Sequence, residues 1–334
     1  MQKASSSGFS KNLLISSVGR RCELVEIFKR AFHKRGWKVF GADALQTAPA
    51  LYFCDEKFVI PKISDEKAYI ESLIQICRQN NVGILVPTID TDLDILAKNS
   101  ERFLREAGTF VLVSSPETVK LCRDKNLTQQ FFEENSIPAP RQIPLDANPD
   151  NLDYPLIIKP RFGSSSIDTF DINNKREFLF FKDYIKDPII QQKIIGTEFT
   201  IDAFCDFGAN PISVVPRERI AVRSGEVLKG KIAKDGEIIA LSIKILRLLK
   251  TIGHITLQCI KNSDGIFFIE INPRFGGGAP MSMLSGANSA ENIALLLEGK
   301  KLEYSENFAE NRTFLRFDSS IALDENFERI EPDD

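Results

Sequence analysis

Residues 268–278 read FIEINPRFGGG, and this stretch decides how the rest of the chain is interpreted. An apolar run carries Glu270, Asn272 and Arg274 at every second position, and three glycines follow. Side chains two apart on a strand point to the same face, so carboxylate, amide and guanidinium share one face here. Asn, Pro and Gly are poor strand formers, which places this polar face where the strand ends. A solvated outer face is the alternative, but we expect a functional site.

The composition is that of an ordinary globular protein with room for two or more domains. The chain has 334 residues, of which 43% are hydrophobic and 27% charged, and a net charge of −3. This charge gives no general attraction to nucleic acid, and no run approaches the ~18 apolar residues that span a bilayer. We therefore expect no nucleic-acid partner and no membrane partner. The polar, Ser-rich residues 1–10 are predicted to be disordered.

Cysteine and histidine usage restricts the chemistry. The six cysteines are scattered without a CxxC pair, and His33 and His254 are the two histidines. Neither a zinc cluster nor a disulfide framework is expected, and the cysteines favour a reducing, cytoplasmic location. Mechanisms built on a histidine base are disfavoured, so catalysis must depend on carboxylates, lysines, arginines and metal.

The chain changes character near residue 115. Residues 11–115 alternate buried strands with helices, which predicts an α/β domain with a doubly wound parallel sheet. Two short helices and a Pro-rich linker follow, and beyond them the strands come close together. Residues 116–334 are therefore expected to form a second domain of antiparallel α+β structure.

The expected hairpin of residues 253–273 brings polar side chains together. We place its tip at a three-residue loop, Ser263–Asp264–Gly265, so that Asn262 lies opposite Ile266. Gln258 then lies opposite Glu270, because 258 + 270 equals 262 + 266. Gln258, Glu270 and Asn272 form a set of three oxygen ligands suited to Mg²⁺. A structural Gln–Glu pair is the alternative.

These residues, together with LIIKPRFGSSS at 156–166, resemble the ATP-grasp superfamily over residues 12 to about 300. The chain looks most similar to stand-alone proteins related to one half of the carbamoyl-phosphate synthetase large subunit. The resemblance implies an N-terminal pre-ATP-grasp domain and a two-lobed ATP-grasp domain with a mobile lid at about 127–195. It also implies ATP and Mg²⁺ as cofactors, with Mn²⁺ as a substitute.

The resemblance assigns the nucleotide-binding residues. Lys125 and Lys159 would contact ATP phosphates, and a loop of small residues would close over the triphosphate. A hinge would receive adenine, and Glu198 would bind the ribose hydroxyls. The loop residues are Gly163, Ser164, Ser165 and Ser166, and the hinge residues are Gln192, Lys193 and Ile194. Surface charges and an ordinary Gly/Ser loop are the alternatives for these positions.

Arginines complete the expected site. Arg217 and Arg219 share one strand face, and with Arg274 they could neutralise a developing phosphoryl charge and a substrate carboxylate. Gly19, Arg20 and Arg21 stand between a strand and a helix, where phosphate sits in dinucleotide folds. Their glycine pattern is incomplete, so this turn, if used, serves the second substrate.

We expect an enzyme, an ATP-dependent ligase of the carboxylate–amine (or carboxylate–thiol) type. It would activate a small-molecule carboxylate as an acyl phosphate, join it to a nucleophile, and release ADP and phosphate. One alternative is a bicarbonate-activating, carbamoyl-phosphate-synthetase-like enzyme, although the chain holds one ATP-grasp module where that large subunit uses two. Another is a nucleotide-binding regulator without turnover. A homodimer is left open.

Overall fold

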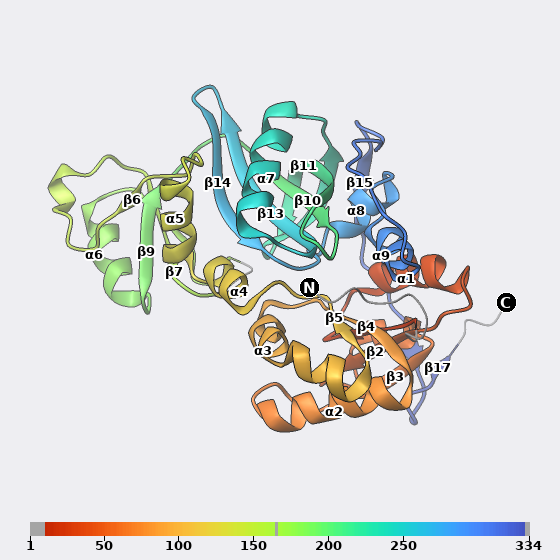
Figure 1. Ribbon diagram of the computed structural model, residues 1–334. Coiled ribbons are helices and arrows are strands. Elements are labelled where there is room, and N and C mark those ends of the chain that lie inside the picture. Colours follow the sequence, from red (N-terminus) through yellow and green to blue (C-terminus); the bar gives the residue numbers. More distant parts are fainter. Residues whose placement is uncertain (1–10, 164–165, 331–334) are drawn as a thin grey trace.

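The computed structural model describes residues 11–163 and 166–330 and shows three sheets of four or more strands (Figure 1). The N-terminus expected to be disordered, residues 1–10, lies outside the described residues, as do Ser164 and Ser165. Across the two described ranges, no helix combines the length and the apolar character that a membrane span requires.

A five-stranded parallel sheet begins the fold, with strand order β3-β2-β1-β4-β5. Leu13 and Ile15 pack on one face with helix α1, while Leu14 packs on the other with α2 and α3. Because helices cover both faces of this sheet, its strands carry unbroken apolar runs. The predicted doubly wound α/β fold is confirmed. The elements are β1 (Asn12–Ser16), α1 (Cys22–His33), β2 (Val39–Asp43), η1 (Pro49–Phe53), β3 (Glu56–Val59), α2 (Glu66–Gln79), β4 (Val82–Pro87), α3 (Asp90–Ala107) and β5 (Phe110–Val111).

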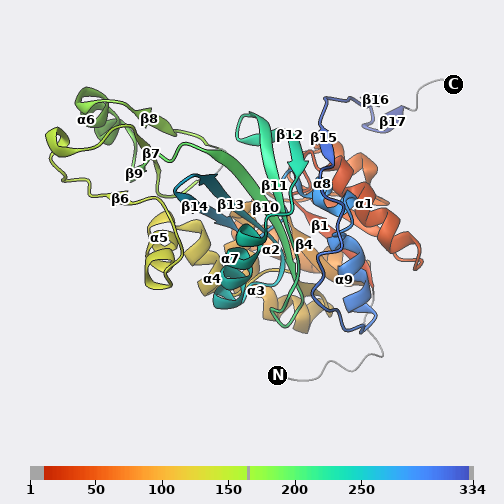
Figure 2. The ribbon, with the colours of Figure 1, turned by 90° about the horizontal axis from the view of Figure 1, so that it is seen from above.

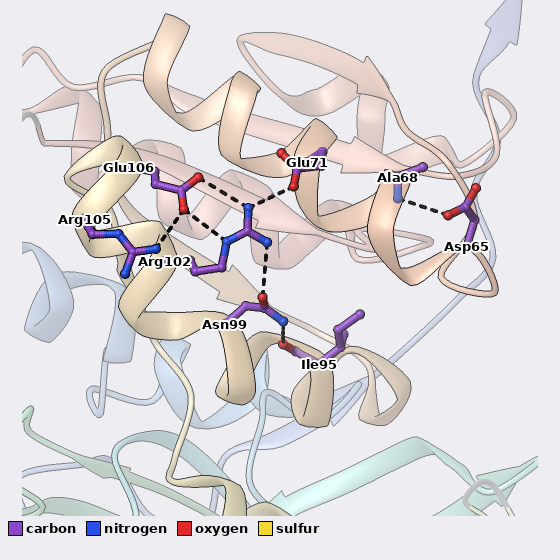
Figure 3. A network of polar contacts seen from close by, with 8 residues as sticks. All are labelled: Asp65, Ala68, Glu71, Ile95, Asn99, Arg102, Arg105 and Glu106. Atoms are coloured by element: carbon purple, nitrogen blue, oxygen red, sulfur yellow. Dashed lines mark hydrogen bonds and ion pairs between the residues drawn. The ribbon is translucent and has the colours of Figure 1, made fainter.

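A polar network on the surface joins α2 to α3. Arg102 donates to Glu71 of α2 at 2.9 Å and to Glu106 of its own helix at 3.1 Å (Figure 3). Exposed pairs of this kind contribute little individually, about 0.2–1 kcal/mol each. Together with the apolar contacts beneath, they fix the helix whose first residue, Asp90, reaches the site.

Two short helices connect this sheet to a separate lobe. Asp124 ends α4 (Pro116–Arg123) and caps α5 (Lys125–Glu134), because its carboxylate accepts from the backbone N–H groups of Asn126 and Leu127. The same carboxylate pairs with Arg161 at 2.6 Å. The start of α5 is thereby tied to the strand that carries Lys159.

The lobe is an antiparallel sheet of order β6-β9-β7-β8 that projects from the rest of the molecule (Figure 2). Its apolar residues form a small core of their own, which includes Ile158, Phe178 and Ile190. A separate core is what a lid that moves as a unit would need, although its motion stays a prediction. The elements are β6 (Gln142–Ile143), η2 (Pro149–Asn151), β7 (Leu156–Pro160), β8 (Phe170–Ile172), α6 (Lys175–Tyr184) and β9 (Pro188–Gln192).

A six-stranded antiparallel sheet of order β14-β13-β10-β11-β12-β15 carries most of the site. Helix α7 covers one face through Ile238 and Ile245, and Phe275 and Ile293 join a core shared with the first sheet. The five-stranded and six-stranded sheets are thus joined by a shared core, whereas the lobe has a core of its own. The elements are β10 (Thr197–Cys205), β11 (Pro211–Arg223), β12 (Glu226–Ile232), α7 (Gly236–Leu249), β13 (Gly253–Asn262), β14 (Gly265–Asn272), α8 (Ala279–Leu284), α9 (Ser289–Leu297) and β15 (Thr313–Leu315), followed by the hairpin β16 (Ala322–Leu323) and β17 (Arg329–Ile330).

The register of the β13–β14 hairpin shows that the expected turn was wrong and that the expected pairing of Gln258 with Glu270 was right. Asn262 pairs with Gly265 and not with Ile266, so the turn has two residues. The Asn262 side chain accepts from the Asp264 N–H at 2.9 Å and so tightens this turn. A β-bulge at Ile269 then absorbs one residue, and Gln258 lies opposite Glu270 as expected.

Candidate active site

The three expected oxygen ligands line one cavity of about 510 Å³. Gln258 lies opposite Glu270, and Thr256 lies opposite Asn272 on the same strand pair. Among the described residues, the side chains of Gln258 and Glu270 make no hydrogen bond or ion pair, while Asn272 accepts from Arg274 at 3.4 Å. Gln258 and Glu270 therefore offer two oxygen groups, on adjacent strands that line the cavity, whose protein hydrogen bonds are unmade. A bound metal ion would give both groups a partner.

The donor set fits magnesium. Mg²⁺ binds hard oxygen atoms and usually takes one or two carboxylates together with substrate phosphates. Glu270 supplies one carboxylate and the two amides supply neutral oxygens. No group of three or more His, Cys, Asp or Glu residues suited to a metal occurs in the described part of the chain. This agrees with a site that leaves coordination positions to phosphate and water.

The three expected arginines line the same cavity, and each is held by a carboxylate. Arg274 pairs with Asp90 at 2.6 Å, Arg219 with Glu198 at 3.2 Å and Arg217 with Asp202 at 3.3 Å. Glu198, which was expected to bind ribose, thus forms an ion pair with Arg219. Burial raises the pKa of the Glu198 carboxyl group. The structure therefore brings the expected arginines together and supplies the partners that fix their positions.

Arg217 belongs to a buried polar network. Its side chain is 1% exposed, and Asp202, equally buried, also accepts from Ser282 at 2.5 Å and lies 3.6 Å from His254. Burial acts to raise the pKa of Asp202, but Arg217, His254 and Ser282 together bring it down to about 2. Nη1 of Arg217 is buried and has no hydrogen-bond partner among the described residues.

The run of three glycines makes room for these groups. A Cβ at Gly278 would lie 2.5 Å from Nη2 of Arg217, and one at Gly276 would lie 2.9 Å from Thr256. A Cβ at Gly277 would lie 3.1 Å from the carboxylate of Glu226. Side chains here would displace the arginine or fill the cavity, which is the physical reason for FGGG after the strand.

The two expected lysines both lie close enough to Glu270 for its charge to act on them. Lys125 donates to the Gly163 carbonyl at 2.9 Å and lines a smaller cavity, of about 90 Å³, with Glu270 and Asn272. Burial lowers the pKa of Lys125 and brings that of Lys159 to about 8, although Glu270 favours the charged form of both. The Lys159 ammonium group makes no hydrogen bond or ion pair with any described residue, and Lys159 is absent from the walls of both cavities. Both ammonium groups therefore stand where an anion would stabilise them.

The loop of small residues is described in part. Gly163 has φ +119°, a conformation that favours glycine, and Ser166 lines the larger cavity. Ser164 and Ser165 lie outside the described residues, so the expected contact of this loop with a triphosphate stays a prediction.

The expected adenine hinge is not brought to these cavities. Gln192, Lys193 and Ile194 are absent from the walls of both, and the Lys193 ammonium pairs with Asp171 at 2.6 Å. The Gln192 N–H donates to the Arg141 carbonyl, which leaves that group bound within the sheet. Their role toward a base stays a prediction.

Several cavity residues were missed by the sequence interpretation. Asp90 and Thr91 stand just after β4, at the carboxyl end of a parallel strand, where ligands bind in open α/β sheets. That rule could have found them. Thr200, Thr256 and Glu226 also line the cavity, but nothing in their local sequence distinguishes them from ordinary strand residues.

Comparison with known proteins agrees with this architecture. Residues 13–112 match the family described as PylC-like, N-terminal domain, and residues 122–278 match the ATP-grasp domain. The carbamoyl phosphate synthase large chain of Acidobacterium capsulatum is 25% identical over 230 residues, which are 62% of this chain and 21% of that protein. The chain thus spans about a fifth of the length of this curated relative.

Solved structures share the fold over nearly the whole chain. The biotin carboxylase domain of Hydrogenobacter thermophilus 2-oxoglutarate carboxylase, in complex with MgADP, ADP and bicarbonate, has a TM-score of 0.72 at 16% identity and covers 92% of this chain and 74% of that one. The L-amino acid ligase of Bacillus licheniformis has a TM-score of 0.68 at 20% identity and covers 92% and 79%.

The chain carries an ATP-grasp domain that follows an N-terminal parallel-sheet domain, as its sequence indicated. It is also similar to part of the carbamoyl phosphate synthase large chain. The ATP-grasp domain supports an ATP-dependent ligase in general terms, with ATP and Mg²⁺ as the general cofactors of such domains.

Proposed function

We propose that the protein activates a small carboxylate with Mg·ATP as an acyl phosphate and joins it to an amine or thiol, releasing ADP and phosphate. One observation carries this proposal: the side chains of Gln258 and Glu270 have no hydrogen-bond or ion-pair partner among the described residues, and they line one cavity with the guanidinium groups of Arg217, Arg219 and Arg274. A cavity that combines oxygen ligands with fixed cations suits phosphoryl transfer to an anionic acceptor.

The proposed roles follow from position. Lys125 and Lys159 would bind the phosphates of ATP, and Gln258, Glu270 and Asn272 would hold Mg²⁺. The metal, when bound, would neutralise charge on the terminal phosphates. Arg217 and Arg274, which line the cavity, would orient the substrate carboxylate, while Arg219 and Glu198 would lie beside the nucleotide. Mn²⁺ as a substitute, a homodimer and a role for the hinge residues stay predictions.

The chemistry proceeds by two displacements. A carboxylate oxygen attacks the γ-phosphorus, the bond to the β–γ bridging oxygen breaks, and ADP leaves. The nucleophile then attacks the carbonyl carbon, the carbon–oxygen bond to the phosphoryl group breaks, and the nucleophile loses a proton as phosphate departs. The chain's contribution is to orient the reactants and to supply fixed charge, which such transfers chiefly require.

Bicarbonate is the second candidate for the activated carboxylate. A structural neighbour with this fold was solved in complex with MgADP and bicarbonate, which is itself a small carboxylate. The same cavity would then make carboxyphosphate. The two candidate reactions differ in the acid that is activated. In both, the bond between the γ-phosphorus and the β–γ bridging oxygen of ATP is broken.

The experiment follows which bond of ATP breaks. The protein is supplied with Mg·ATP and a panel of small carboxylates, bicarbonate and amines, and products are separated. We expect ADP and phosphate, and a carboxylate labelled with ¹⁸O should pass one label to the phosphate because that oxygen bridges carbon and phosphorus. AMP and pyrophosphate, or phosphate without label, would contradict the mechanism. ATP binding without turnover on any mixture would favour a regulator.

A further inference from the structure

The turn Gly19–Arg20–Arg21 lies beside the candidate site but has no role at its nucleotide end. Both arginines line a hollow of about 230 Å³, and Arg20 also lines a neighbouring one of about 500 Å³. Arg21 and Glu226 line the Glu270 cavity as well, and Glu226 lines all three. The three hollows therefore share walls, with Glu226 at their junction.

The charges in this region are unequally paired. Arg316 pairs with Glu226 at 3.1 Å, and Arg223 pairs with Asp318 at 2.8 Å. Arg21 donates to the Thr88 carbonyl at 2.7 Å and meets no carboxylate within the described residues. Burial, and next the repulsion of Arg274, lower the pKa of Arg21 to about 10.

Two further side chains in this region make no direct contact with an opposite charge. The side chains of Arg20, just before α1, and of Glu23, in its first turn, make no hydrogen bond or ion pair with the described part of the chain. With Arg21, they place two guanidinium groups and one carboxylate around the smaller hollow without a salt bridge, although more distant charges such as Glu226 act on them.

We propose that these hollows bind the nucleophile as a small amino acid, with its carboxylate on Arg20 and Arg21 and its ammonium group toward Glu226. This inference rests on the proposed ligase function and names the class of the second substrate. A guanidinium pair recognises a planar carboxylate by two parallel hydrogen bonds. Glu226 faces the Glu270 cavity, so the amine end would lie toward the activated carbonyl carbon.

The charge balance argues against a phosphorylated acceptor. A phosphate monoester carries nearly two negative charges, whereas Glu23 and Glu226 offset much of the positive charge in the hollow. Although burial acts to raise it, the pKa of Glu226 is kept below its usual value by Arg316, so this carboxylate stays ionised at neutral pH. A zwitterion satisfies both signs of charge at once.

The activated carboxylate has a different guanidinium. Arg217 is 1% exposed and lines the Glu270 cavity. Arg20 is absent from the walls of that cavity, and Arg21 lines both it and the smaller hollow, so two carboxylates can be held at once without sharing an arginine.

The test measures thermal stabilisation of the full chain in saturating Mg·ADP by each of the twenty amino acids in turn. The best-bound amino acid is then compared with its decarboxylated amine, its deaminated acid and inorganic phosphate. We expect stabilisation by the amino acid and a Kd about 10- to 100-fold weaker for the amine, which lacks the arginine contacts. Arg20→Ala should weaken binding of the amino acid similarly, and Arg21→Lys should do so while keeping a positive charge at this half-buried position. Arg30→Ala, an exposed change on the same helix, is the matched control.

The outcomes separate this inference from the proposed function. Stabilisation by Mg·ADP but by none of the twenty amino acids would overturn the inference and leave the ligase proposal standing. Tighter binding of phosphate than of any amino acid, lost in Arg20→Ala, would also overturn it, in favour of a phosphorylated acceptor. Failure of Mg·ADP itself to stabilise the protein would contradict the proposed function.

Discussion

Two groups of side chains at the candidate site differ in how their charges and polar atoms are satisfied. The side chains of Lys159, Gln258 and Glu270 make no hydrogen bond or ion pair with the described residues, and the charge of Glu270 acts on Lys159. In the second group, Arg217 and Arg274 are held by carboxylates at 3.3 and 2.6 Å. Partnerless groups await charge from a ligand, whereas paired groups are fixed before any ligand arrives. Changes to the first kind should therefore affect binding and turnover, and changes to the second kind should affect stability.

The largest expected effect is on stability, at Asp202. Asp202→Asn removes the charge that balances the buried Arg217, and breaking a buried pair by removing one partner costs about 3–5 kcal/mol. Chemical denaturation would measure the loss. Asp264→Asn, at the exposed hairpin tip, should stay within about 0.5 kcal/mol. A stable Asp202→Asn protein would remove the distinction between the two kinds of charge.

A comparably large effect, on turnover alone, is expected at Glu270. Glu270→Gln keeps the shape of the side chain but removes the one carboxylate of the ligand set. We expect the rate of ADP release to fall on the order of 10²-fold or more, with the melting temperature unchanged or raised. Glu134→Gln, an exposed change on α5, is the control. Near-normal turnover in a folded Glu270→Gln protein would exclude this residue from the site.

A smaller effect should appear in the pH dependence of stability. The folded-state pKa of Asp202 is about 2, below the value of about 3.8 of an unperturbed carboxyl group. Its contribution is present above pH 4 and is lost as the pH falls through 2. The shift corresponds to about 2 kcal/mol in the free energy of unfolding. Acid titrations of the wild type and Asp202→Asn should differ in this window, and parallel curves would contradict the assignment.

The smallest effect concerns nucleotide binding at alkaline pH. Burial holds the pKa of Lys159 at about 8, and phosphate would raise it because the charged form gains a partner. Binding above pH 8 should then take up a proton, so affinity for Mg·ADP should fall by up to about tenfold per pH unit.

Calorimetry in buffers of different ionisation enthalpy would detect that proton. Lys159→Arg keeps its charge at all these pH values and should flatten the dependence. Lys175→Met, on the exposed face of α6, should retain it. An unchanged slope in Lys159→Arg would assign the titration to another group.

Local sequence was sufficient for the elements of the site. The alternation of apolar and polar residues placed Glu270, Asn272 and Arg274 on one strand face, and the two strands of the hairpin were found. The predicted turn had three residues and the observed turn has two. The hydrogen bond of the Asn262 side chain and the bulge at Ile269 decide the turn length, and the alternation of apolar and polar residues does not contain this information.

What the sequence by itself determined was the succession of a parallel-sheet domain and a domain of antiparallel α+β structure, since strand and helix periods are local properties, and the resemblance of its motifs identified the second as ATP-grasp. What only the tertiary structure decided was the set of partners: Asp90 for Arg274, Asp202 for Arg217 and Glu226 at the junction of three hollows. These contacts join residues far apart in the chain. Their energies depend on burial and distance, and neither quantity exists until the chain has folded.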